Sequence, residues 1–206
     1  MTAYVERASV PPHLVDERDP PAIALLKEDH QILRAMFDLV ETAEDDVLVP
    51  IAADICVRLV IHMAVEEHSL FPALRPVIGN REIDEGMVEH EVSKRLISEI
   101  MEMADRKEVL RARVHVLGET TVHHIDEEDR VIFRDSRKAW EEGKIDLVEL
   151  GNEMSRLRRE LFDLVGSVAG DTHNVDLEPM GKAIEELPRS IGADVMGANV
   201  PIEGQA

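Results

Sequence analysis

Apolar residues recur three and four positions apart over most of the chain, the spacing that places side chains on one face of an α-helix. The first stripe follows Pro20 and Pro21, with Asp19 as the expected N-cap of its helix. It consists of Ile23, Leu26, His30, Leu33, Phe37 and Val40. The pattern therefore predicts a buried helical face with one histidine in its middle.

Three more stripes of this kind follow. We expect the second helix to begin at Pro50 and to end near Pro72 and Pro76, the third to run over about 83–104, and the fourth over about 108–142. Ionisable residues again interrupt each stripe: His62 and Glu66, then His90, then His124 and Glu128. Ionisable groups at buried positions need a compensating partner inside the protein.

The stripes predict an all-α fold, an up-down-up-down antiparallel four-helix bundle over residues 21–142. Residues 1–20 are polar and broken by prolines, so we expect an extended N-terminal arm there. Leucines at helical spacing predict an additional C-terminal helix over 143–168, packed on the bundle or on another subunit. Residues 169–206 are rich in Gly, Pro and acidic residues and predict a flexible acidic tail, with one short helix near 182–186.

Charge and cysteine usage exclude several partners and sites. The chain has 43 acidic and 23 basic residues, and its formal net charge of -20 repels nucleic acids and anionic membranes. Cys56 is the only cysteine, which excludes a disulfide framework and a thiolate metal cage. Charges and prolines fill the first residues, and no stretch approaches the roughly 18 apolar residues of a membrane span. We therefore expect a cytoplasmic protein that binds neither nucleic acid nor membrane.

The ionisable residues of the stripes repeat as a pattern. His30 precedes His62 by nearly the interval that separates His90 from His124, and each second histidine has a glutamate four positions later. The flanking residues agree as well, since HMAVEEHSLF (62–71) and HIDEEDRVIF (124–133) share Glu at the fifth place, an acid at the sixth and Phe at the tenth. This duplication indicates two helix pairs with the same role.

Four positions rotate a helix by about 400°, so His62 and Glu66 project from one face, as do His124 and Glu128. In a bundle these faces converge on four imidazoles and two carboxylates. Burying an ionised carboxylate without compensation costs several kcal/mol, and a pair of divalent cations supplies the missing charge. Nitrogen-rich, sulfur-free ligands favour Fe, with Zn and Mn as alternatives. We expect Glu66 and Glu128 to bridge two ions, one held by His30 and His62 and the other by His90 and His124.

Two other helical metal patterns do not fit. Ferritin-like sites need Glu three residues before His, and here those positions hold Lys27, Leu59, Met87 and Thr121. The zinc-protease pattern HExxH begins at His90-Glu91, but its last position is Lys94.

The motifs together resemble the hemerythrin family, in its bacterial branch known as the HHE cation-binding domain, from about Ala22 to Arg134. The resemblance is carried by AIALLKEDHQIL, IHMAVEEHSLFPALR, VEHEVSKRL and VLGETTVHHIDEEDRVIF. It implies a non-haem di-iron site with an oxo or hydroxo bridge, in which Glu66 and Glu128 are the bridging carboxylates. It also implies a function among O2 binding, sensing, and the handling of peroxide, NO or iron.

The sequence departs from the oxygen-carrying members at two positions. Those members have a second histidine one turn after the third-helix histidine, where this chain has Lys94, and they have Asp where it has Glu128. Lys94 lies about 40° round the helix from His90. We therefore expect Lys94 beside the metal, donating a hydrogen bond to a bound peroxide or, if neutral, ligating. The departure argues against simple reversible O2 carriage.

Residues next to the motifs are expected to have lesser roles. Glu67, His68, Glu127 and Asp129 rotate off the buried face, so we expect them to be mainly solvated, with a supporting part behind the ligands for some of them. We expect His123 on the helix surface or behind the ligands, and surface positions for His13, His115 and His173.

Three functions are compatible with these residues. The leading interpretation is a di-iron protein that binds or senses O2 or reactive oxygen and nitrogen species. The second is a di-iron enzyme that decomposes peroxide, and the third is an interaction module whose protein partner or second copy binds according to the state of the iron.

Overall fold

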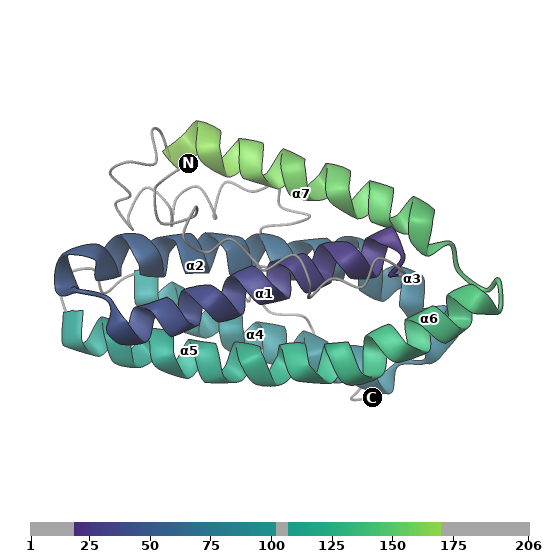
Figure 1. Ribbon diagram of the computed structural model, residues 1–206, viewed down its shortest axis with the longest axis horizontal. Coiled ribbons are helices and arrows are strands. Elements are labelled where there is room, and N and C mark those ends of the chain that lie inside the picture. Colours follow the sequence, from purple (N-terminus) through teal and green to yellow (C-terminus); the bar gives the residue numbers. More distant parts are fainter. Residues whose placement is uncertain (1–18, 102–106, 170–206) are drawn as a thin grey trace, which may run out of the picture.

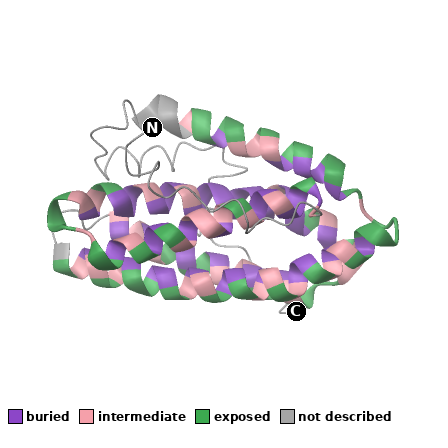
Figure 2. Ribbon diagram, viewed as in Figure 1, coloured by how far each residue is buried: buried purple, intermediate pink, exposed green. Residues whose placement is uncertain are grey.

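The computed structural model of the protein describes residues 19–101 and 107–169, and this part of the chain is helical without any strand. Four long helices lie side by side, α1 (Pro21–Thr42), α2 (Asp45–Val65), α4 (Arg81–Met101) and α5 (Lys107–Glu127) (Figure 1). Their apolar stripes face inward, and every residue of the first predicted stripe is buried (Figure 2). The prediction of an all-α fold is confirmed.

Two of the long helices continue through short π-helical segments. The segment η1 (Glu66–Leu70) joins α2 to α3 (Phe71–Ile78), and η2 (Glu128–Ile132) joins α5 to α6 (Phe133–Glu141). The second and fourth predicted helices are therefore present as long rods, each interrupted by one π turn that the sequence pattern did not predict.

The second rod does not begin or end at the prolines that the sequence pattern predicted as its boundaries. The helix already begins at Asp45, where Asp45 and Asp46 place negative charge in its first turn, so Pro50 lies inside it. The rod passes Pro72 and Pro76, which are exposed on the solvent side, and ends at Gly79. Gly79 has φ +100°, a conformation that glycine adopts at little cost.

The rod Asp45–Ile78 is long and apolar enough to cross a membrane by length and composition, so the expectation that no stretch approaches a membrane span was wrong. Of its most apolar window, 72% is buried inside the protein. A helix that is apolar all round needs cover on every side, and α1, α4, α5 and α7 (Leu147–Ala169) pack on α2 or on its π turn.

The expected cap of the first helix has another role. The N-cap is Pro20, without a side-chain cap hydrogen bond, and Asp19 lies one position outside it. The Asp19 carboxylate accepts hydrogen bonds from Lys27 Nζ at 2.7 Å and from Arg137 Nε at 2.8 Å. Asp19 therefore ties the start of α1 to α6 instead of capping the helix.

The helix α7 lies along α1 and α2 (Figure 1). The backbones of α7 and α1 approach closely at Gly151, where an added Cβ would lie 2.4 Å from the backbone nitrogen of Ala22. Arg158 of α7 also donates a hydrogen bond to Asp29 of α1 at 2.6 Å. The expected division into arm, bundle, extra helix and tail stays a prediction, since residues 1–18 and 170–206, including the predicted short helix near 182–186, lie outside the described residues.

Candidate metal centre

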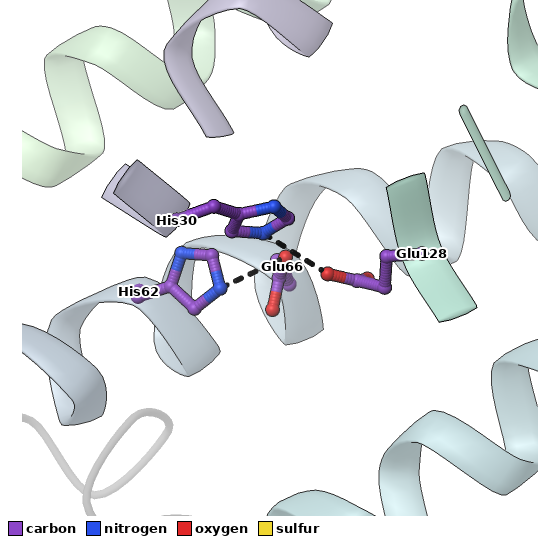
Figure 3. Close-up of side chains that lie close together, drawn as sticks. All are labelled: His30, His62, Glu66 and Glu128. Atoms are coloured by element: carbon purple, nitrogen blue, oxygen red, sulfur yellow. Dashed lines mark ion pairs between the residues drawn. The ribbon is translucent and has the colours of Figure 1, made fainter. Parts of the chain in front are cut away.

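Six buried ionisable residues from four helical rods meet in the middle of the bundle. Ligand atoms of His30, His62, Glu66 and Glu128 all lie within 4.8 Å of one another, and those of Glu66, His90 and His124 form a second such group. Each of the six residues is at most 5% exposed. Figure 3 shows the first group, with the imidazoles of His30 and His62 turned toward the two carboxylates. The structure thus brings together all six residues that the sequence singled out.

Each glutamate lies between a histidine of one expected ion and a histidine of the other. Glu66 Oε1 is 3.3 Å from His62 Nε2, and Glu66 Oε2 is 3.3 Å from His90 Nε2. Glu128 Oε2 is 3.3 Å from His30 Nε2 and 3.5 Å from His124 Nε2. A carboxylate that serves two metal ions needs this position between them.

The other ring nitrogen of each histidine, Nδ1, points outward to a second carboxylate. Such a carboxylate fixes the orientation and tautomer of a metal-binding imidazole and raises its basicity. The Nδ1 atoms of His30, His90 and His124 lie at hydrogen-bond distance from Asp129 (3.2 Å), Glu67 (2.7 Å) and Glu89 (2.8 Å). His62 Nδ1 lies 3.8 Å from Asp29, beyond hydrogen-bond distance.

The sequence pattern predicted only part of these contacts between outer carboxylates and histidines. Glu67 was expected to be mainly solvated, but its side chain is 4% exposed, and Asp129 is 36% exposed with one oxygen on His30. Asp29 and Glu89 were missed altogether. The available signal was their place directly before His30 and His90, but each contacts the histidine of the neighbouring rod, which only the packing of the rods determines.

In the structure, residues of each sequence repeat contact a histidine of the other helix pair. The Phe at the tenth place of the first repeat, Phe71, stacks on His90 with ring centroids 5.4 Å apart, and Phe133 of the second repeat stacks on His30 at 5.5 Å. The acid at the sixth place contacts the same histidine in each case. Each repeat therefore orients a histidine of the other helix pair.

Both π turns begin at the two buried glutamates, Glu66 and Glu128. The N–H of Phe71 donates to the carbonyl of Glu66, and the N–H of Phe133 donates to the carbonyl of Glu128, five residues back in each case. The next residue of each turn also contacts a histidine of the centre: Glu67 is 4% exposed and Asp129 is 36% exposed. π turns inside α-helices occur frequently at functional sites.

Unsatisfied polar atoms are concentrated at this centre. Among the described residues, ten buried side-chain nitrogen or oxygen atoms have no hydrogen-bond partner, and seven belong to His30, His62, Glu66 and Glu128. At His90 and His124 the Nε2 atoms lie 3.1 Å apart. In the tautomers whose Nδ1–H donates to Glu67 and Glu89, two lone pairs face each other there. Buried polar atoms are normally paired, so this donor set fits a group of metal ions.

The two glutamates differ in their affinity for protons. Burial and the neighbouring Glu128 carboxylate raise the pKa of Glu66 well above its usual range. Burial alone would also raise the pKa of Glu128, but the imidazoles of His124 and His30 hold it well below its usual range. Burial lowers the pKa of His90 to about 4, which keeps this imidazole neutral and able to ligate.

Lys94 is buried one turn from His90, but its ammonium interacts with the outer carboxylate. Lys94 Nζ donates to Glu67 Oε2 at 2.7 Å, while Glu67 Oε1 accepts from His90 Nδ1. An ammonium in such a pair has no free lone pair to ligate a metal. The geometry favours a part for Lys94 behind His90 over the expected one at a coordination position.

The remaining histidines within the described residues do not belong to the two inner groups of ligand atoms. His115 and His123 are exposed, as expected for His115, and His68 is half-buried with Nδ1 2.9 Å from the carbonyl of Ala64. His13 and His173 lie outside the described residues. Burial raises the pKa of Cys56 to about 12, so this thiol stays protonated within the core.

Replacing Lys94 with Met should destabilise the metal-free protein by roughly 3–5 kcal/mol, because it leaves the buried Glu67 carboxylate without its cation. Urea unfolding measures this change. Glu67→Gln in the Lys94→Met background should restore part of the loss, whereas strictly additive effects of the two substitutions would contradict a coupled pair.

Comparison with known proteins identifies the family. No curated protein and no solved structure matches the chain significantly. The family profile of the hemerythrin HHE cation-binding domain matches residues 22–135, more than half of the chain and the part that contains all six buried ionisable residues. The chain belongs to the hemerythrin family of HHE cation-binding domains.

Proposed function

We propose that the protein binds two iron ions through His30, His62, Glu66, His90, His124 and Glu128, with both glutamates as bridges. The observation that carries this proposal is the set of buried, unpaired ligand atoms between four imidazoles whose outer nitrogens face carboxylates. Buried polar groups are normally paired, so a concentration of unpaired ones at one place supports a bound ligand that completes them. We infer as well that the four rods alternate in direction, which the short connections between α1 and α2 and between α3 and α4 support.

The kind of donor favours iron over softer or harder ions. Four imidazoles and two carboxylates form a sulfur-free set that is richer in nitrogen than Mg²⁺ or Ca²⁺ prefer. Such a non-haem di-iron centre supplies redox chemistry toward O2, peroxide or NO. The residues of this chain would hold the ions, orient the imidazoles and keep bulk water away from them.

We propose binding or sensing of O2 or of reactive oxygen and nitrogen species as the function of this centre, in the cytoplasm. The family supports a metal-bound small ligand, and Lys94 replaces the additional histidine of the oxygen carriers. The Lys94–Glu67–His90 series of contacts links a charged group to one ligand, so loss of Lys94 would alter the response of the iron to its ligand.

The protein purified from iron-supplemented cells should contain about two irons per chain and show visible charge-transfer bands that respond to dithionite and to air. His62→Ala should lower the iron content to one or none, because it removes a buried ligand. His115→Ala, an exposed histidine on α5, is the matched control and should keep both ions. Elemental analysis with absorption spectroscopy measures these quantities, and zinc alone or a metal-free protein would overturn the proposal.

The same samples separate the alternatives. Catalytic turnover of peroxide that is lost in His62→Ala would identify an enzyme. Capture of a protein partner that depends on iron or O2, without turnover, would identify an interaction module. Reversible spectral changes with O2, peroxide or NO, without peroxide turnover and without capture of a partner, would support binding or sensing.

Glu66→Leu should stabilise the metal-free protein by roughly 1–4 kcal/mol, because it replaces an unpaired buried carboxyl with an apolar side chain of similar size. The same substitution should abolish the added stability that iron gives to the wild type by binding the folded state. Urea unfolding with chelator and with ferrous iron measures both effects. Glu119→Leu, at a 71% exposed position of α5, is the control and should neither stabilise the metal-free protein nor remove the stabilisation by iron. A metal-free Glu66→Leu protein that is less stable than wild type would contradict the account.

A further inference from the structure

A cavity of about 190 Å³ connects the metal centre with the surface beside α4 and η2. We call it the vestibule. Its inner wall includes His124 and Glu128, and its outer wall includes Glu82, Glu85, Glu89, Glu127, Arg81 and Arg130. Gly86 also lines the cavity, and a Cβ there would lie in van der Waals contact with His124 Cε1 at 3.4 Å. The vestibule therefore leads from the surface to the half of the centre that contains His124.

A second group of metal-type ligands lies beside the vestibule. Ligand atoms of Glu89, His123 and Glu127 all lie within 4.8 Å of one another, and Glu89 and Glu127 line the cavity. His123 and Glu127 are four positions apart on α5, the spacing of His124 and Glu128, so two such pairs overlap in the sequence HHIDEE. His123 is 67% exposed, so this outer group is open to solvent.

The outer group is joined to the inner centre by one side chain. Glu89 Oε2 accepts from His124 Nδ1 at 2.8 Å, and Glu89 Oε1 lies 3.9 Å from His123 Nε2. Across the vestibule, the Glu128 carboxylate is 1% exposed, and neither of its oxygens has a hydrogen-bond partner. Glu128, which carries this unpaired carboxylate, is thus one of the residues that line the cavity at whose outer wall the second group lies.

The charge of the vestibule favours a cation. Glu82, Glu85, Glu89 and Glu127 outnumber the two guanidiniums on its wall. Arg130 Nη2 lies 3.3 Å from Glu127 Oε1, so one carboxylate of the outer group already attracts positive charge, and an arriving divalent ion would displace the 71% exposed Arg130. The negative charge of the whole chain adds to this attraction.

We propose that Glu89, His123 and Glu127 form a weak divalent-cation site, at which ferrous iron binds before it passes through the vestibule to the inner centre. Two carboxylates and one imidazole, open to water, give a hydrated site that can release its ion again. This proposal rests on the proposed function, because the outer site would deliver iron to the inner centre proposed above.

Manganese(II) titration of the iron-loaded protein tests the outer site. Because bound Mn²⁺ loses its aqueous paramagnetic resonance signal, the titration should detect one additional weakly bound ion per chain. His123→Ala and Glu127→Gln should each weaken its binding about tenfold or more, as loss of supporting groups at metal sites does. The control His115→Ala removes an exposed histidine of the same helix that also lies beside glutamates, and it should leave binding unchanged. Equal binding in all variants, or no additional ion, would overturn the site.

Anaerobic uptake of ferrous iron by the metal-free protein tests the passage. The His123→Ala and Glu127→Gln proteins should fill the inner centre several-fold more slowly than wild type and His115→Ala. All four proteins should reach the same final iron content. Filling at the wild-type rate would overturn the passage while leaving the inner centre intact. Failure of the wild type itself to take up two irons would instead contradict the proposed function, so the two failures are distinguishable.

Discussion

The candidate metal centre depends on two carboxylates, Glu66 and Glu128, that lie close together in the protein interior without hydrogen-bond partners. Ionised carboxylates at such positions cost several kcal/mol unless positive charge compensates them. Four imidazoles surround the pair with Nε2 directed inward, and carboxylates face each Nδ1 on the outside. The centre is thus layered as carboxylate, imidazole and carboxylate, and this order matches what a pair of metal ions requires.

The duplicated motif explains how a small bundle holds so many groups in place. Each repeat contributes one buried glutamate of the centre, and its next acid and its Phe contact a histidine on the opposite helix pair. Because this support is exchanged, one histidine of each half, His90 or His30, is contacted by residues of the other helix pair. The helix α7, beyond the residues that the family profile matches, adds a further contact through Arg158 and Asp29 toward His62.

The sequence predicted the helical class and the six residues that converge, because both follow from periodicity within single helices. It did not predict what depends on contacts between helices. Asp29 and Glu89 carry no periodic signal, and the inward position of Glu67 goes with its contacts to His90 and Lys94 of α4. Proline was overvalued as a boundary, since Pro50, Pro72 and Pro76 all lie within one rod. The apolar character of that rod reflects its burial on all sides.

The most direct test is an anomalous-scattering experiment at the iron edge on crystals of the iron-loaded protein. The account predicts two peaks between Glu66 and Glu128, one beside His30 and His62 and the other beside His90 and His124. A single peak, or peaks away from these six residues, would contradict the di-iron centre.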